Sequence, residues 1–383
     1  MLLIRNAKLF TMEGAGYIEN GDVLIDGGRI ATVGENLKAD GAQVIDAKGC
    51  YAMPGIVDAH CHIGLYEDTI GSAGADGNEA TDPVTPHLRG IDAVNPADFS
   101  FREAVEHGVT TVATGPGSAN VIGGQFVAMH TYGKYVDEMI IKEPLALKTA
   151  FGENPKRVYG GKSRIPSTRM GTAAVFREAF IAAQDYARKM ANEDESKRPD
   201  RDMKKEILAK ALSGELLVKS HAHRADDIVT ALRLGREFGL RQTIDHCTEG
   251  YLILDELKKY NAKCILGPLL SERSKIELGN MTFKAPAAFY KAGVPFALMT
   301  DHPVIPLHFL MVEAAICVRE GLPEYEALKA ITINAADVIG LGDQVGSLKA
   351  GKVADVVLYD GHPLDTRSHV TTVVAGGEKV FER

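Results

Sequence analysis

The sequence lacks the long apolar run that a membrane-spanning segment needs. Crossing a bilayer takes about 18 or more consecutive apolar residues, and no run among the 383 residues reaches that length. The first residues, Met1-Leu2-Leu3-Ile4-Arg5, offer three apolar residues after Met1, which is too short for the core of a signal peptide. We therefore expect no membrane partner and no secretory leader.

An excess of positive charge is also missing. The 43 Lys and Arg residues are outnumbered by 51 Asp and Glu, for a net charge of −8. This balance excludes a general binder of nucleic acid or of anionic membranes. Cysteine is scarce, and its five positions are scattered: Cys50, Cys61, Cys247, Cys264 and Cys317. We expect reduced thiols and a cytoplasmic location. The apolar content of 45% allows a core of normal size, which excludes disorder and a disulfide-stapled small fold.

Several catalytic signatures are absent. No G-x-S-x-G nucleophile elbow occurs, and no G-x-G-x-x-G follows a predicted strand. The run Gly160-Gly161-Lys162-Ser163 resembles the end of a phosphate-binding loop, but the earlier position that requires glycine is Lys156. The chemistry must therefore rest on other side chains.

The two ends of the chain have the pattern of β structure. Residues 22–33 form two alternating runs joined by Asp26-Gly27-Gly28, which predicts a hairpin. Residues 353–359 and 371–374 are rich in β-branched side chains, and Gly376-Gly377 predicts a further turn.

Between about residues 54 and 342, short apolar runs alternate with helical patterns. The spacing of apolar residues, two first-turn aspartates and Gly239 predict a helix over 225–238. The eight strand candidates are 56–62, 109–114, 124–131, 145–151, 216–222, 242–247, 263–267 and 296–301. Eight β/α units in this length fit a (β/α)8 TIM barrel, which needs about 250 residues. A doubly wound sheet is the alternative. The third unit is the least typical, because no helix of normal length fits between 131 and 145.

Metal-ligand residue types close several of these strands. His60 and His62 end the first strand and share one face, so two imidazoles about 6–7 Å apart can chelate one metal ion. His221, His246 and Asp301 each end a later strand, and the carboxyl ends of barrel strands form the active-site rim. Such nitrogen and oxygen donors suit Zn²⁺, with Fe²⁺, Mn²⁺ or Co²⁺ also possible. Hydrogen-bonded histidines without a metal are the alternative.

Lys148 is a further candidate. It lies in the middle of the fourth strand, between Ala146 and Ala150 on one face. A charged amine in that place is costly, and a neutral amine can react. If Lys148 captured CO₂, the carbamate would be an anion able to bridge two metals. A salt-bridged lysine that reaches the rim is the alternative, and the sequence leaves both open.

Candidate substrate contacts follow two of the strands. Arg157 belongs to a basic group after the fourth strand that could hold a substrate carboxylate, although a solvated loop is the alternative. His223 comes two residues after His221, and His302 follows Asp301. Each could contact substrate or hydrogen-bond a metal ligand.

Two motifs resemble those of one known superfamily. The run Pro54-Gly55-Ile56-Val57-Asp58-Ala59-His60-Cys61-His62 resembles the first-strand signature of metal-dependent amidohydrolases. The run 346–357, GSLKAGKVADVV, resembles their return into a small β domain. The chain is most similar to the imidazolonepropionase-related branch, which includes dipeptidase-like and prolidase-like enzymes. The resemblance implies a barrel over 54–342 and a small β-sandwich from 1–53 plus 343–383.

The resemblance also implies roles for the ligand residues. His60 and His62 match the pair of the more buried metal, and His221 and His246 match the histidines of a second metal. Lys148 matches a carboxylated lysine that bridges the two.

Asp301 matches an eighth-strand aspartate that binds the first metal and handles the proton. Arg224 stands where deaminases and imidazolonepropionase carry Glu, three residues after the fifth-strand histidine. The resemblance therefore favours a two-metal hydrolase over deamination or the histidine-pathway reaction.

The expected activity is hydrolysis of a C–N amide bond in a small molecule, linear or cyclic, such as a dipeptide or an N-acyl amino acid. A bound metal lowers the pKa of water to about 7, and Asp301 would take the proton and return it to the leaving nitrogen. The alternatives are a non-catalytic amidohydrolase-like scaffold and a mononuclear deaminase or imidazolonepropionase-type enzyme. We also expect a homo-oligomer.

Overall fold

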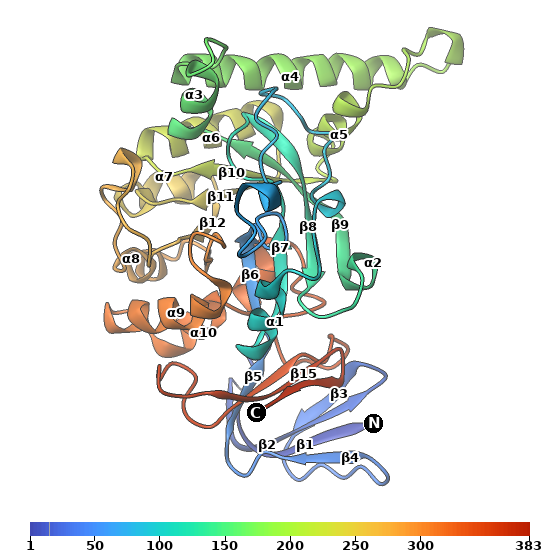
Figure 1. Ribbon diagram of the computed structural model, residues 1–383, viewed down its shortest axis with the longest axis vertical. Coiled ribbons are helices and arrows are strands. Elements are labelled where there is room, and N and C mark those ends of the chain that lie inside the picture. The colour runs from blue at the N-terminus through green and yellow to red at the C-terminus, as the bar shows by residue number, and fades with distance from the viewer. Residues whose placement is uncertain (15) are drawn as a thin grey trace.

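Two eight-stranded sheets organise the chain in the computed structural model, which describes residues 1–14 and 16–383. One sheet comes from the middle of the chain and the other from both ends (Figure 1). Figure 1 shows the end sheet at one pole together with both termini, and the long helix α4 (Arg169–Met190) at the opposite pole. Within the described residues, no helix combines the length and the apolar character that a bilayer crossing requires.

The middle sheet follows chain order from its first strand to its last. Its strands are β6 (Ile56–Cys61), β7 (Val109–Thr114), β8 (Ile122–His130), β9 (Ile140–Ala150), β10 (Leu217–Ala222), β11 (Gln242–His246), β12 (Lys263–Leu266) and β13 (Phe296–Leu298). The two edges approach each other just beyond β13, where the Asp301 amide donates to the His60 carbonyl at 3.3 Å. The sheet is therefore a nearly closed barrel, and each of the eight predicted runs overlaps one of its strands. This arrangement excludes the open doubly wound alternative.

The third strand corrects the expectation of eight parallel β/α units. β8 pairs antiparallel with both β7 and β9, whereas the other neighbours pair in parallel. Only residues 115–121 and 131–139 connect β8 to its neighbours, and α2 (Val136–Met139) has four residues. A parallel crossover needs about a dozen residues or more, so the chain turns back on itself at both ends of β8.

Helices follow most of the other strands. They are α1 (Phe99–Glu106), α3 (Glu153–Gly160), α5 (Met203–Leu212), α6 (Ala225–Phe238), α7 (Leu254–Lys259), α8 (Ala285–Ala292), α9 (Leu310–Arg319), α10 (Glu324–Ala330) and α11 (Ile333–Val338). Helix α6 confirms the predicted bounds. It ends at Gly239, whose φ of +67° lies in the left-handed region that glycine adopts without a steric penalty.

The end sheet combines residues from both termini. Its strands are β1 (Leu2–Phe10), β2 (Tyr17–Asp26), β3 (Arg29–Gly34), β4 (Gln43–Asp46), β5 (Tyr51–Pro54), β14 (Val356–Tyr359), β15 (Val370–Ala375) and β16 (Glu378–Glu382). The predicted hairpin is confirmed, because β2 pairs with β3 across Gly27 and Gly28, both at positive φ. The strands form one hydrogen-bonded sheet that branches at β1, to which β4 and β5 both pair.

Candidate metal centre at the carboxyl ends of the barrel strands

A first group of metal-ligand side chains lies where β6 and β13 meet. His60 and His62 come from the end of β6, and Asp301 follows β13 in a turn with a φ of +54°. The Asp301 Oδ1 atom is 3.1 Å from His62 Nε2 and 3.5 Å from His60 Nε2. One donor atom from each of the three side chains lies within 4.8 Å of the others. The structure therefore brings together the three residues predicted for one metal.

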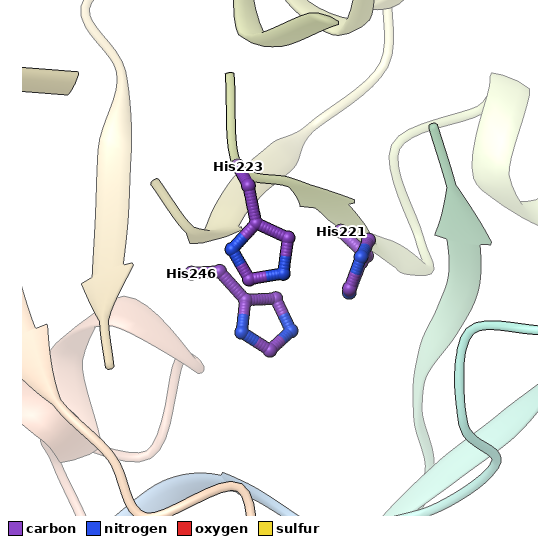
Figure 2. Close-up of side chains that lie close together, drawn as sticks. All are labelled: His221, His223 and His246. Carbon is purple, nitrogen blue, oxygen red and sulfur yellow. The ribbon is translucent and has the colours of Figure 1, made fainter. Parts of the chain in front are cut away.

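A second group lies at the ends of β10 and β11. Figure 2 shows the rings of His221, His223 and His246 gathered side by side. Their centroids are 4.2 to 4.7 Å apart, and their donor atoms also lie within 4.8 Å of one another. The sequence analysis had proposed His223 as a substrate contact, but the structure also groups it with the candidate ligands.

Three histidines are fixed in one tautomer, which directs a lone pair into the site. The Nδ1 atom of His60 lies 2.6 Å from Asp245 Oδ2, that of His62 lies 2.7 Å from the Gly115 carbonyl, and that of His246 lies 2.9 Å from the Gly267 carbonyl. Oxygen acceptors require a proton on Nδ1, so the Nε2 of each neutral ring carries the lone pair. The Nε2 of His62 lies 3.1 Å from Asp301 Oδ1, a contact that is satisfied by a proton on that nitrogen or by a cation between the two atoms.

The chemistry of this donor set fits a divalent metal. Burial lowers the pKa of His60 and of His223 to about 3, so both rings are neutral at pH 7 and can act as ligands. Both ring nitrogens of His221 are buried, and neither has a hydrogen-bond partner in the described structure. Buried polar atoms normally have a partner, and a metal ion would supply one.

Lys148 lies between the two groups. Its side chain is fully buried, and its Nζ atom is 3.0 Å from His60 Nε2. The rings of His60 and His246, one from each group, are 5.4 Å apart between centroids. Burial lowers the pKa of Lys148 to about 8, so about one amine in ten is neutral at pH 7. A neutral amine is the form that reacts with CO₂.

A buried ion pair behind His60 was missed by the sequence analysis. The Asp245 Oδ2 that binds His60 also lies 3.0 Å from Lys219 Nζ, and the Thr243 hydroxyl donates to Oδ1 at 2.6 Å. Lys219 donates further to the Ala59 carbonyl at 2.9 Å. Burial raises the pKa of Asp245, but Lys219 and His60 outweigh burial and hold it well below its usual value. The carboxylate thus keeps its charge and orients His60.

Asp58, part of the first-strand motif, ties the two edges of the barrel together. Its Oδ2 accepts from the Thr300 amide at 3.0 Å and hydroxyl at 2.6 Å, and its Oδ1 accepts from the His60 amide at 2.9 Å. Because Thr300 precedes Asp301, these bonds set the position of Asp301 relative to His60.

The remaining predicted residues lie in different surroundings. Arg157 is exposed on α3 and stays a prediction. Arg169, the first residue of α4, forms a two-pronged ion pair with Asp227 of α6, at 2.8 and 2.9 Å, so this arginine joins two helices. His302 is buried, which lowers its pKa to about 4, and both of its ring nitrogens are unpartnered among the described residues. Its substrate role also stays a prediction.

The amidohydrolase family matches residues 51–380 of the chain. The chain belongs to this family. An amidohydrolase from Thermotoga maritima MSB8, known from its crystal structure, is 44% identical with a TM-score of 0.97, and all of both chains is covered. Amidohydrolase tasK of Hapsidospora irregularis is 31% identical over 99% of this chain and 43% of its own length. The imidazolonepropionase of Caldanaerobacter subterraneus subsp. tengcongensis is 27% identical over 95% of this chain and 91% of its own length.

The chain thus spans less than half of tasK but nearly all of the imidazolonepropionase. The predicted superfamily is confirmed, and so is the prediction of an enzyme that hydrolyses carbon–nitrogen bonds.

Proposed function

We propose that this amidohydrolase hydrolyses an amide bond, linear or cyclic, in a small molecule, using two divalent metal ions at the carboxyl ends of the barrel strands. The observation that carries the proposal is the fixed tautomer of His60, His62 and His246, each with its Nδ1 bound to oxygen. With Nδ1 held by oxygen, each ring turns its Nε2 toward the site, where His60 Nε2 lies 3.0 Å from Lys148 Nζ and His62 Nε2 lies 3.1 Å from Asp301 Oδ1. Imidazole nitrogens and a carboxylate oxygen in this arrangement are donors that a divalent cation binds. In this proposal residues 54–342 form the catalytic unit, and 1–53 with 343–383 form a second unit.

Two ligand sets follow from the two groups. His60, His62 and Asp301 would hold one metal, and His221 and His246 would hold the other. Zn²⁺ suits these donors best, with Fe²⁺, Mn²⁺ or Co²⁺ as alternatives. His223 is close enough to the second set to be a third imidazole ligand.

Lys148, as a CO₂-derived carbamate, would bridge the two sets. Its place between them, its full burial and its lowered pKa support this assignment.

When bound, the metal ions would supply Lewis acidity and a water of lowered pKa. The chain's own residues supply the proton transfer. Burial raises the pKa of Asp301, but its contact with His62 and the positive charges around it outweigh burial and lower that pKa. Asp301 is therefore a carboxylate at neutral pH, able to accept a proton from the attacking water and pass it to the leaving nitrogen.

The alternative of a mononuclear deaminase or an imidazolonepropionase-type reaction has less support. Arg224 occupies the place of the glutamate in those enzymes, and its guanidinium is paired with Asp226 at 2.9 Å on the surface. A non-catalytic scaffold would be expected to have lost some of its metal ligands, whereas this chain keeps all six candidate ligands.

Metal analysis together with a substrate screen tests the proposal. We expect two metal ions per chain in protein purified without chelator, and turnover of at least one of N-acyl amino acids, Xaa-Pro or Xaa-Arg dipeptides, or cyclic ureides. Chelation should abolish that turnover, and Zn²⁺ or Mn²⁺ with bicarbonate should restore it. Negligible metal content that these additions do not change would refute the two-metal site. One metal with no bicarbonate effect would favour the mononuclear alternative.

A further inference from the structure

The connection between β12 and α8, residues 267–284, lies against the second histidine group. It begins at Gly267, whose carbonyl holds His246. Arg273 donates to the carbonyls of Gly279 at 3.1 Å and Met281 at 2.8 Å, which fastens the connection to itself. The side chains that it carries toward the histidines are therefore held in defined positions.

Glu277 of this connection is fully buried beside His223. Its Oε1 atom is 3.7 Å from His223 Nε2, and its Oε2 accepts from the Glu153 amide at 3.1 Å. The same Oε1 accepts from Lys275 Nζ at 3.5 Å. Both carboxylate oxygens are thus engaged by the chain, and the side chain has no exposed surface with which to bind a substrate cation.

Lys275 differs from Glu277 in having donors to spare. Its side chain is 32% exposed, and its ammonium directs one of three N–H groups to Glu277 over a long 3.5 Å contact. The same Glu277 Oε1 lies 3.5 Å from Lys275 Nζ and 3.7 Å from His223 Nε2, so this ammonium lies close to the histidines. Two other cations that follow β9 are committed, since Lys162 binds the Ala80 carbonyl at 2.6 Å and Arg169 binds Asp227.

We infer that Lys275 binds a carboxylate of the substrate. The preferred substrates are then amides in which the amine half, the part that leaves with the nitrogen, carries a free carboxylate. The inference rests on the proposed function and names the substrate class of the same site. On a chain of net charge −8, the overall field does not attract an anion, so recognition depends on a local cation. An ammonium acts there as a point charge with rotatable donors.

Matched ligand pairs test this inference. The probes are N-acetyl derivatives of alanine, leucine, phenylalanine, lysine and aspartate. Each is compared with the corresponding N-acetyl amino acid amide, in which a primary amide replaces the C-terminal carboxylate. The parent, Lys275→Gln, Lys275→Arg and Lys284→Gln are compared in their metal-loaded forms. Lys284 is an exposed lysine of the same connection and serves as the matched control.

Both turnover and binding are measured, the latter by calorimetry. The parent should prefer the acid of each pair. Lys275→Gln should raise KM and Kd for the acids by about tenfold to a hundredfold, the range for a hydrogen bond to a charged group. Its kcat should stay within about threefold, and its values for the amides should not change. Lys275→Arg should keep most of the preference, and Lys284→Gln should keep all of it.

The outcomes separate this inference from the proposed function. Turnover of the amides without any preference for acids in the parent, or a preference that survives Lys275→Gln, overturns the inference and leaves the function standing. Acid-selective binding that Lys275→Gln abolishes, with no turnover of any probe or of the wider screen, supports the carboxylate site and refutes the amide substrates of the proposed function.

Discussion

Replacing Asp245 with Asn should weaken both the fold and the metal site. The carboxylate lies 2.6 Å from His60 Nδ1 and 3.0 Å from Lys219 Nζ, and all three side chains are fully buried. An amide oxygen can still accept from His60 but no longer neutralises Lys219. The expected results are a lower free energy of unfolding and weaker metal binding.

The size of the effect follows from burial. Removing one partner of a buried ion pair costs about 3–5 kcal/mol. For 383 residues the unfolding entropy is about 0.8 kcal/mol per kelvin, so the metal-free chain should lose about 4–6 °C in Tm. Because Asp245 also fixes the His60 tautomer, metal affinity should fall about 10-fold to 100-fold.

The assay combines calorimetric melting of the metal-free chain with metal competition against a chelating dye. The control is Glu237→Gln, which breaks the exposed pair between Arg177 and Glu237 at 2.8 Å and should cost under about 1 kcal/mol. Adding Lys219→Met to Asp245→Asn removes both buried charges and should recover most of the Tm, while metal affinity stays low.

Two results would contradict this reasoning. If Asp245→Asn melts within a degree of the parent, the pair contributes no more than a surface pair does. If the double variant recovers metal affinity together with Tm, Asp245 stabilises the barrel but does not orient His60.

Three further predictions concern the site itself. Asp301→Asn should lower kcat/KM at least about 100-fold with metals retained; turnover within a few-fold of the parent would show that Asp301 is not the proton carrier. Lys148→Ala should abolish activity, and formate or acetate should restore part of it by replacing the carbamate; parent-like activity without these acids would exclude a bridging role. In the metal-free chain, burial holds the pKa of His60 and His223 at about 3 and that of His302 at about 4, so the unfolded chain binds more protons below about pH 6.5. Stability should fall by about 1.4 kcal/mol per pH unit for each ring as pH drops from 6.5 toward these values, and a Tm equal at pH 5 and pH 7 would contradict this.

The grouping of the strand-end residues could be predicted because it follows from where each residue stands in its own strand. The His60 and His62 pair, His221, His246 and Asp301 each follow an apolar run, and the carboxyl ends of parallel barrel strands meet at one rim. Chain position alone therefore placed them together. The direction of β8 was not anticipated, although its short connections contained the signal, because they leave no room for a crossover.

Partners that meet across strands were harder to anticipate. Lys219 lies in the middle of β10, two residues before His221 and on the same face, and the reasoning applied to Lys148 would have selected it. Its pairing with Asp245 depends on the register between β10 and β11, in which His221 lies opposite Asp245. Glu277 lies in a 3-10 helix of three residues, Ile276–Leu278, and Lys275 directly precedes it. A helix this short has no periodicity that marks these side chains as facing the site.

Because β8 runs antiparallel to its neighbours, the two connections that flank it should differ in how well they tolerate inserted residues. Residues 115–121 turn at the rim and include Gly115, whose carbonyl holds His62. Residues 131–139 turn at the other end of the barrel, where the Tyr132 hydroxyl lies 3.5 Å from Asp355 Oδ1 beside the end sheet. Insertions in the second segment, such as a tag or a fused domain, would leave the chemistry undisturbed, whereas a single added residue in the first would shift the acceptor on which the His62 tautomer depends. Diversification of this enzyme, natural or engineered, should therefore use the turn at the end of the barrel opposite the candidate metal centre.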